Sequence, residues 1–250
     1  MPEPIKSLDS PRAVMTPAGG PKSLGIIGGI APVTTIDYYR WLIAGWRERV
    51  PNGSYPGILI NSIDLSRVVT LVTTGRLDEL ADWLVREVGR LAAGGAEVAL
   101  IAANTPHIVF DAVASRSPIP LISIVEASAE ETVRRGFGRV GLLGTRFTME
   151  GSFYRDVFAR NGIDLLAPEP EDLTFVHEAY MKELIPGTFR PETRAQVLVI
   201  VDRLREAGAE AVLLAGTELS PLLDGVENPA LPLLDTGRIH VQRALAEMQR

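Results

Sequence analysis

The sequence has no cysteine, few aromatic residues and no long hydrophobic run. The absence of cysteine from all 250 residues excludes disulfide bonds, thiolate metal ligands and thiol catalysis. No apolar stretch reaches the roughly 18 to 20 residues needed to span a bilayer, and the chain does not begin with the pattern of a secretion signal. We therefore expect a cytoplasmic protein that does not act in a membrane.

Patterns that bind nucleic acids, metals or nucleotides are also missing. The net charge is −6, and no run of lysine or arginine would follow a phosphate backbone. The three histidines, His107, His177 and His240, are 70 and 63 positions apart, so no local metal-binding spacing exists. The segment GIIGGIAP matches neither glycine pattern of nucleotide-binding loops. We expect no nucleic-acid partner, no metal and no cofactor.

What the sequence does contain is an internal repeat. The segment GAEVALIAAN from Gly95 matches GAEAVLLAGT from Gly208 without a gap, a shift of 113 positions. LGIIGG from Leu24 matches VGLLGT from Val140 after a shift of 116, and IPLIS matches LPLLD after a shift of 112. Three collinear matches indicate two similar lobes around a pseudo-twofold axis, with equivalent strand ends facing each other across a cleft.

Each half of the sequence alternates between strand and helix patterns. Short aliphatic runs such as Leu24–Ile27 are typical of buried parallel strands, and apolar residues at helical spacing follow them. We predict an α/β fold of two pseudo-symmetric lobes, each a mostly parallel sheet flanked by helices, with a ligand cleft between them. Residues 1–22 are predicted to form a flexible tail, residues 24–125 with 236–250 the first lobe, and residues 126–235 the second.

The ends of the predicted strands supply the candidate binding residues, because ligands of such sheets bind beyond the carboxyl ends of the strands. The candidates are Gly29, Ile30, Asn61, Asn104, Thr105, Thr145 and Thr217. An alternative role for Asn104, Thr105 and Thr217 is to cap the helices that follow, which is a common use of these residues. Their recurrence in both repeats favours the binding of a carboxylate.

Five short segments form a specific set of sequence motifs, which are IGGIAPVTTIDYYR, NTPH, LGTRFTMEGSFYR, GTEL and DTGRIH. The region in which they occur, from about Leu24 to the C-terminus, is about nine tenths of the sequence. With this set the chain resembles the aspartate/glutamate racemase superfamily of cofactor-independent amino-acid racemases. The resemblance implies the two-lobed fold, an isomerase acting on a small amino acid, and a homodimer.

The resemblance also implies where such racemases hold their two thiols, and this chain lacks both. Relatives place one cysteine on each side of the substrate α-carbon, at the positions of Ala103 and Gly216. Inversion of a stereocentre requires proton exchange on opposite faces, and neither of these side chains carries a proton. A two-thiol mechanism is therefore excluded, and the candidate proton carriers are Glu218, His107 or a water molecule.

A second departure concerns the side chain of the ligand. The resemblance places Val72 and Ile185 where relatives that take Asp or Glu hold the distal carboxylate with polar or basic residues. A carboxylate there would lose its hydration without gaining a partner, at a cost of roughly several kcal/mol. We therefore expect a small amino or carboxylic acid with a more apolar side chain.

Two functions from different classes stay open. The first is an enzyme of amino-acid racemase or isomerase type that acts at the α-carbon by a non-thiol route, with Asn104, Thr105, Thr145 and Thr217 holding the acid group. The second is a catalytically inactive carboxylate-binding protein descended from a racemase. Family resemblance favours the enzyme, and the loss of both thiols favours the binding protein. Replacement of the thiols of an active racemase by mutation is a third alternative, which the absence of cysteine elsewhere disfavours.

Overall fold

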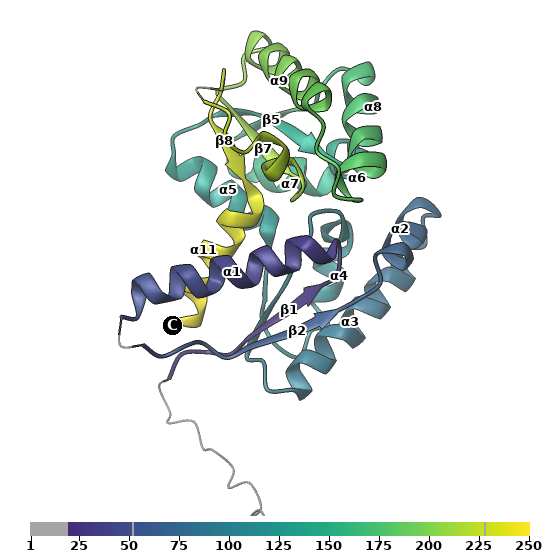
Figure 1. Ribbon diagram of the computed structural model, residues 1–250. Helices are drawn as coiled ribbons and strands as arrows, with labels where there is room; N and C mark the ends of the chain where they lie inside the picture. The colour runs from purple at the N-terminus through teal and green to yellow at the C-terminus, as the bar shows by residue number, and fades with distance from the viewer. Residues whose placement is uncertain (1–19, 52, 228) are drawn as a thin grey trace, which may run out of the picture.

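The computed structural model describes residues 20–51, 53–227 and 229–250 and has two lobes, one above the other in Figure 1. The first lobe has a sheet with the strand order β2-β1-β3-β4, and the second has a sheet with the order β6-β5-β7-β8. Neighbouring strands are parallel throughout both sheets. Helices flank each sheet, so the predicted α/β fold of two parallel-sheet lobes is confirmed.

The elements of the two lobes follow each other along the chain. The first lobe begins with β1 (Leu24–Gly28), α1 (Pro32–Arg49), β2 (Ile58–Ser62), α2 (Leu65–Thr73), α3 (Leu77–Ala93), β3 (Val98–Ile101), η1 (Thr105–Val109), α4 (Phe110–Ala114) and β4 (Leu121–Ile122). The chain continues with α5 (Ile124–Arg134), β5 (Arg139–Gly144), α6 (Arg146–Glu150), α7 (Ser152–Arg160), β6 (Asp164–Leu166), α8 (Pro170–Ala179), η2 (Tyr180–Leu184), α9 (Pro191–Glu206), β7 (Ala211–Ala215), α10 (Leu219–Leu223), β8 (Leu233–Asp235) and α11 (Thr236–Met248).

The internal repeat of the sequence extends to the pairing of individual residues. Ala99 of β3 pairs with Leu121 of β4, and Val212 of β7 pairs with Leu233 of β8. These two pairs are related by the same shifts, 113 and 112, that relate the sequence segments. The two sheets therefore share strand order and register, as expected for a duplicated unit.

Equivalent glycines allow a helix to pack closely on each sheet. A Cβ atom at Gly25 in β1 would lie 3.1 Å from Leu91 of α3, and a Cβ atom at Gly141 in β5 would lie 2.8 Å from Leu204 of α9. Contacts this short require the neighbouring side chain to move. Glycine at both positions therefore permits the same close approach of helix and sheet in each lobe.

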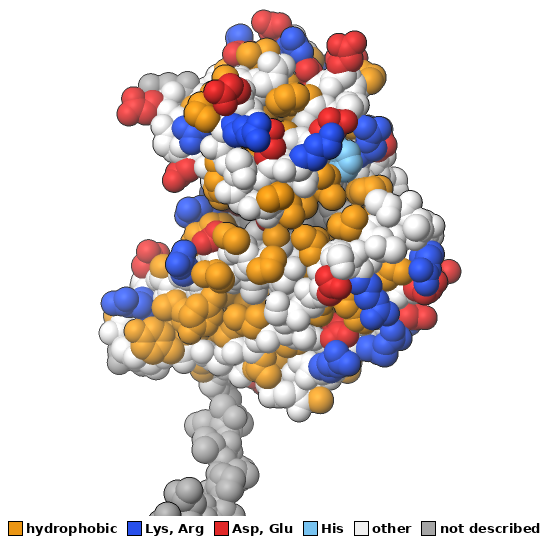
Figure 2. Space-filling view, turned by 45° about the vertical axis from the view of Figure 1, so that its right-hand side comes forward, with side chains coloured by type: hydrophobic (Ala, Val, Ile, Leu, Met, Phe, Trp, Pro, Cys, Tyr) orange, Lys and Arg blue, Asp and Glu red, His pale blue; other side chains and the backbone are white. Residues whose placement is uncertain are grey.

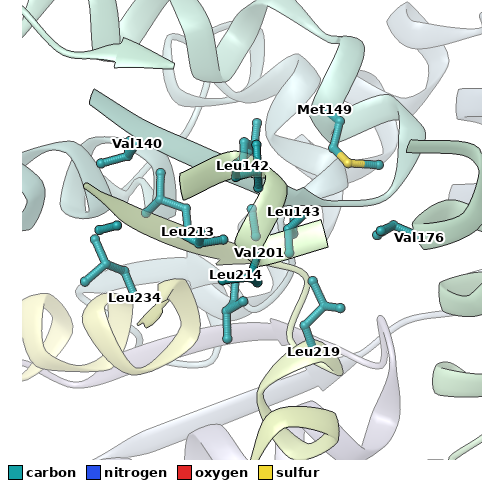
Figure 3. Packing of buried hydrophobic residues seen from close by; sticks show 14 of the residues in the cluster. Val140, Leu142, Leu143, Met149, Val176, Val201, Leu213, Leu214, Leu219 and Leu234 are labelled. Carbon is teal, nitrogen blue, oxygen red and sulfur yellow. The ribbon is translucent and has the colours of Figure 1, made fainter. Parts of the chain in front are cut away.

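Hydrophobic side chains form a core around each sheet. In the first lobe, one cluster lies among β1, β3, α2 and α3, and another lies among β1, α1 and α11. The core of the second lobe surrounds β5 and β7, whose residues Leu142, Leu143, Leu213 and Leu214 are labelled in Figure 3. Buried aliphatic residues on both faces explain why these strands have continuous rather than alternating hydrophobic sequences.

Helix α11 runs from the second sheet to the first lobe. It begins directly after β8 and packs against α1 and α5, as Figure 1 shows for the yellow C-terminal helix. Its residues Val241 and Leu245 are fully buried in the cluster that contains Leu24 and Tyr38. The C-terminal helix therefore contributes to the core of the first lobe.

Two expectations from the sequence concern the start of the chain and the membrane. Of the tail predicted over residues 1–22, residues 1–19 lie outside the described residues, and the backbone N–H of Lys22 donates to the carbonyl of Met248 at 2.8 Å. Within the described ranges, no helix is both long and apolar enough to cross a bilayer.

Candidate functional site

A cavity lies between the two lobes, at the carboxyl ends of their central strands. Its volume is about 50 Å³, which has room for only a few water-sized groups. Hydrophobic side chains gather at the junction of the two lobes in Figure 2. The lining residues are Ile30, Ala31, Leu65, Val68, Val69, Val72, Ala103, Asn104, Thr105, Thr145, Phe147, Tyr180, Met181, Ile185, Ala215, Thr217 and Glu218.

The wall from the first lobe follows strand β3 and holds Ala103, Asn104 and Thr105. Asn104 is 5% exposed, and its Oδ1 accepts a hydrogen bond of 2.6 Å from the hydroxyl of Tyr154 in α7. Its Nδ2 donates to Oγ1 of Thr236 at 3.3 Å. These bonds fix the amide, while the methyl group of Ala103 gives this wall no proton-carrying side chain.

A chain of hydroxyl groups connects the two lobes beside Asn104. Oγ1 of Thr105 and Oγ1 of Thr145 are 3.0 Å apart, and Thr145 is 3.2 Å from Oγ1 of Thr148. Thr145 also caps α6, because its Oγ1 accepts from the backbone N–H of Thr148 at 3.3 Å. Thr105 and Thr145 line the cavity, and in the arrangement in which Thr148 donates to Thr145 and Thr145 donates to Thr105, the hydroxyl proton of Thr105 is left for a ligand.

The wall from the second lobe is built around the carboxylate of Glu218. This residue is 5% exposed and follows Thr217 at the end of β7. Oε1 accepts a hydrogen bond of 2.9 Å from Thr34 of α1, and Oε2 accepts one of 2.9 Å from Thr217. The hydroxyl of Tyr180 also donates to Oε2. A carboxylate has about four lone-pair sites, so one site on Oε1 is still free.

Tyr180 fills the space that a side chain at position 216 would need. A Cβ atom built on Gly216 would overlap the Tyr180 ring at Cε2 and would lie 3.2 Å from its hydroxyl oxygen. Gly216 itself does not line the cavity, whereas Tyr180 does. Burial, and then the charge of Glu218, raises the pKa of Tyr180 well above its ordinary value. The phenol therefore keeps its proton.

The local helix geometry places this tyrosine at the cavity. Tyr180 begins η2, a π-helical turn in which the N–H of Ile185 donates to the carbonyl of Tyr180 at 3.0 Å. Such five-residue turns are rare and occur frequently at functional sites. Tyr180 was not among the site residues predicted from the sequence. The only signal for it was its position five residues before Ile185, a residue already assigned to the ligand's side-chain pocket.

The remaining wall of the cavity is apolar. Val72 of α2 and Ile185, the residue after η2, both line it, together with Leu65, Val68, Val69, Phe147 and Met181. Ile30, after β1, lies on the same cavity. Among the described lining residues, Glu218 is the one with a charged side chain, and none is Lys, Arg or His. The cavity therefore offers apolar contacts and one buried carboxylate.

His107 does not face the cavity as a proton carrier. The N–H of Ile124 donates to Nε2 at 3.2 Å, so Nδ1 carries the ring proton and donates it to the carbonyl of Ala103 at 2.9 Å. Burial lowers the pKa of His107 to about 3. Both ring nitrogens are occupied, and the residue connects the end of β3 to the start of α5.

Two further candidates lie away from the cavity lining. Asn61 is the last residue but one of the edge strand β2 and donates from Nδ2 to Oε2 of Glu87 at 2.7 Å, beside a separate surface depression. The N–H of Gly29 donates to Oγ1 of Thr35 at 2.8 Å, and a Cβ atom there would overlap the backbone of Ile63. Gly29 therefore shapes the β1–α1 loop rather than the cavity surface.

No cluster of three His, Asp or Glu side chains within the described ranges has the arrangement of a metal site. The groups on the cavity walls are hydroxyls, one amide and one carboxylate. This set can bind a small polar group, accept one proton and enclose an apolar side chain.

Comparison with known proteins identifies the family. The model of the Asp/Glu/hydantoin racemase family matches residues 27–244. The chain belongs to this family. It is 28% identical to the glutamate racemase of Desulforudis audaxviator over 181 residues, which are 70% of this chain and 64% of that protein. The chain therefore spans just under two thirds of that relative.

Solved structures of this family have the same fold. A candidate Asp/Glu racemase from Yersinia pestis superposes with a TM-score of 0.84 at 29% identity, and covers 92% of this chain and 100% of that one. An aspartate racemase homologue from Pyrococcus horikoshii OT3 superposes with a TM-score of 0.76 at 30% identity and the same coverage. The resemblance predicted from the sequence motifs is confirmed, and so is the racemase-like fold.

Proposed function

We propose that the protein binds a small amino acid with an apolar side chain between its lobes and exchanges the α-proton from one face only. Membership of the Asp/Glu/hydantoin racemase family supports chemistry at the α-carbon. The observation that carries the proposal is the asymmetry of the cavity. Its first-lobe wall presents the methyl group of Ala103, whereas its second-lobe wall presents Glu218 and Tyr180.

The polar groups of the cavity favour an amino acid over a simple carboxylic acid. The second N–H of the Asn104 amide and the spare proton of the Thr105–Thr145 chain are donors for an acid group. Glu218 brings a negative charge, and no basic residue on the described lining compensates it. A second carboxylate alone would meet that charge at low dielectric, whereas the ammonium group of an amino acid offsets it.

The apolar wall limits the ligand's side chain. Val72 and Ile185 offer no partner to a distal carboxylate. Aspartate and glutamate would therefore bury a second charge without a partner, whereas alanine and 2-aminobutyrate would place only an alkyl group against this wall.

The proton chemistry of the cavity is confined to one side. The free lone-pair site on Oε1 gives Glu218 the capacity of a general base, and threonine hydroxyls are too weakly basic for this role. Racemisation needs a second group on the opposite face, which Ala103 does not supply. We therefore expect exchange of the α-proton with retention of configuration.

The experiment is incubation of the protein with both enantiomers of alanine and of 2-aminobutyrate in deuterated buffer. Proton NMR measures loss of the α-proton, and chiral chromatography measures inversion. Exchange without inversion is the expected result, and the Glu218→Gln variant should lose it, while the exposed Glu192→Gln variant should keep it. Equal rates of exchange and inversion, or no exchange of the α-proton, would overturn the proposal.

A binding protein without turnover is the second candidate. It is favoured because three of the four lone-pair sites of Glu218 already accept hydrogen bonds within the protein. Such a protein is stabilised by its ligand without changing it. A rise in melting temperature with alanine, together with no deuterium incorporation, would select this function over the first.

A further inference from the structure

We propose that Tyr180 is the catalytic group on the second-lobe face, in the place of the missing side chain at position 216. The proposal rests on the one-faced proton exchange proposed above and names the atom that performs it. Tyr180 lines the cavity, and its hydroxyl oxygen lies 3.2 Å from the point where a side chain at position 216 would begin. The sequence thus lacks a proton carrier at position 216, but the fold supplies one from a distant segment.

The hydroxyl of Tyr180 already has a partner that can accept its proton. It donates to Oε2 of Glu218, which also accepts from Thr217, while Oε1 accepts from Thr34. A nucleophile or base that is held by a second, proton-accepting side chain is a common arrangement in catalysis. Tyr180 and Glu218 form such a pair.

The proton transfer on this pair is balanced. The α-C–H bond of the amino acid breaks and its proton binds to the Tyr180 oxygen, while the original phenolic proton moves along the hydrogen bond to Oε2 of Glu218. The electron pair of the C–H bond stays on the α-carbon. Before the return step, the proton now on the Tyr180 oxygen exchanges with solvent through the cavity. The phenol then protonates the α-carbon on the same face with a solvent-derived proton, and Glu218 returns its proton to the phenolate oxygen.

The position of the phenol, between the α-carbon side of the cavity and Glu218, is what suits it to this step. The α-C–H group beside a carboxylate is a very weak acid, so the group that takes its proton must be well placed and must pass its own proton to a neighbouring acceptor. Because burial and Glu218 raise the pKa of Tyr180, a free phenolate is not populated at rest. Transfer to Glu218 in the same step avoids that free phenolate.

The elements that carry the pair are fixed in the core of the second lobe. Val176 lies one helical turn before Tyr180, and Leu184 lies one turn after it, and both are 1% exposed. Leu219, the residue after Glu218, is fully buried in the same cluster, and Val176 and Leu219 are labelled in Figure 3. The phenol and the carboxylate are thereby held in a fixed relative position.

The test compares Tyr180→Phe with the unmodified protein in the deuterium-exchange experiment with alanine. The variant keeps the ring that covers Gly216 and loses only the hydroxyl. We expect the exchange rate at saturating alanine to fall at least 100-fold, with the half-saturating concentration and the ligand-induced rise in melting temperature unchanged. Tyr39→Phe on the exposed side of α1 is the matched control and should exchange normally.

A second variant tests the placement of the ring without removing the hydroxyl. Gly216→Ala introduces a Cβ atom that overlaps Tyr180 and displaces it, so exchange should also fall at least 10-fold while circular dichroism shows a folded protein. Tyr180→Phe with normal exchange, alongside Glu218→Gln without it, would overturn the inference and leave Glu218 as the direct base. An unmodified protein without exchange would overturn both this inference and the proposed function.

Discussion

The two repeats of the chain share a frame but differ where their central strands end. Strand order and register are the same in both lobes. At the end of β3, Ala103 leaves open space in the cavity, whereas at the end of β7 the space beside Gly216 is filled by Tyr180. The duplicated unit has therefore kept its packing and lost the symmetry of its site.

Polar groups at equivalent positions of the two repeats also differ. His107 in the first repeat corresponds to Ser220 in the second, because the shift is 113 positions. His107 uses both ring nitrogens, but the hydroxyl of Ser220 is buried without a hydrogen-bond partner in the described residues. The first lobe is thus held by a histidine contact that the second lobe does not have.

The largest expected effect tests whether the shared frame is equally strong in both lobes. Leu100 in β3 and Leu213 in β7 are equivalent and fully buried. Replacement of either by Ala should lower the free energy of unfolding by about 2 to 5 kcal/mol, because it leaves a cavity in a packed core. Urea denaturation measures the change, and Val133→Ala, at an exposed position, should change it by less than about 0.5 kcal/mol. A large loss for one leucine and none for the other would show that the lobes are not equivalent in packing.

The next effect concerns the buried histidines of the first lobe and depends on pH. Burial lowers the pKa of His107 to about 3 and that of His240 to about 4. In the unfolded chain these histidines have a pKa near 6.5, so their contribution to stability is fully present above that pH and is lost as the pH decreases below it. Between pH 7.5 and 5.5, protonation in the unfolded state should lower the free energy of unfolding by about 1.4 kcal/mol for each histidine and by about 3 kcal/mol for the pair.

Urea denaturation at the two pH values measures this loss. Replacement of His240 by Gln should reduce the loss by about half, whereas His177→Gln should reduce it less because His177 is only partly buried. An unchanged pH dependence in the His240→Gln variant would contradict the assignment.

A smaller effect separates the two positions that lack thiols. Gly216→Cys should lower the free energy of unfolding by about 1 to 3 kcal/mol, because its Cβ atom overlaps the Tyr180 ring. Ala103→Cys, which adds one sulfur atom beside the cavity, should cost less than about 1 kcal/mol. Both are measured by urea denaturation.

A double-mutant cycle with Tyr180→Ala provides the control. In that background the cost of Gly216→Cys should nearly disappear, because the overlapping ring is gone. Strictly additive effects would show that the ring is not what excludes a side chain at position 216.

Most of the two-lobed fold was predictable from the sequence, because the internal repeat and the hydrophobic pattern of the strands can both be recognised directly in the residues. The runs around Ile26 and Leu142 are continuous and aliphatic, as strands buried on both faces require. The strand β6 (Asp164–Leu166) was not predicted. It has three residues at the edge of its sheet, none of them fully buried, so its sequence has no clear period.

The site was predictable only where it follows the central strands. The rule that ligands bind beyond strand ends selected Asn104, Thr145 and Thr217, which lie on the cavity, and also Asn61, which does not because β2 is an edge strand. Tyr180 lies 36 positions before Gly216 and reaches it through a π-helical turn. No local sequence pattern indicates that the ring of Tyr180 fills the space beside Gly216.

The smallest expected effect tests the equivalence of the two repeats at their helix starts. Ser123 caps α5 through backbone N–H groups at 3.2 Å, and Asp235, its equivalent after a shift of 112, caps α11 through the N–H of Arg238 at 3.0 Å. Replacement of either by Ala should lower the free energy of unfolding by about 1 kcal/mol, because a helix N–H group loses its acceptor. Ser152→Ala and Asp156→Ala in α7 are exposed controls outside a cap position. Because α5 and α11 pack against each other, a combined loss that differs from the sum of the two would show that the caps are coupled across the junction of the lobes.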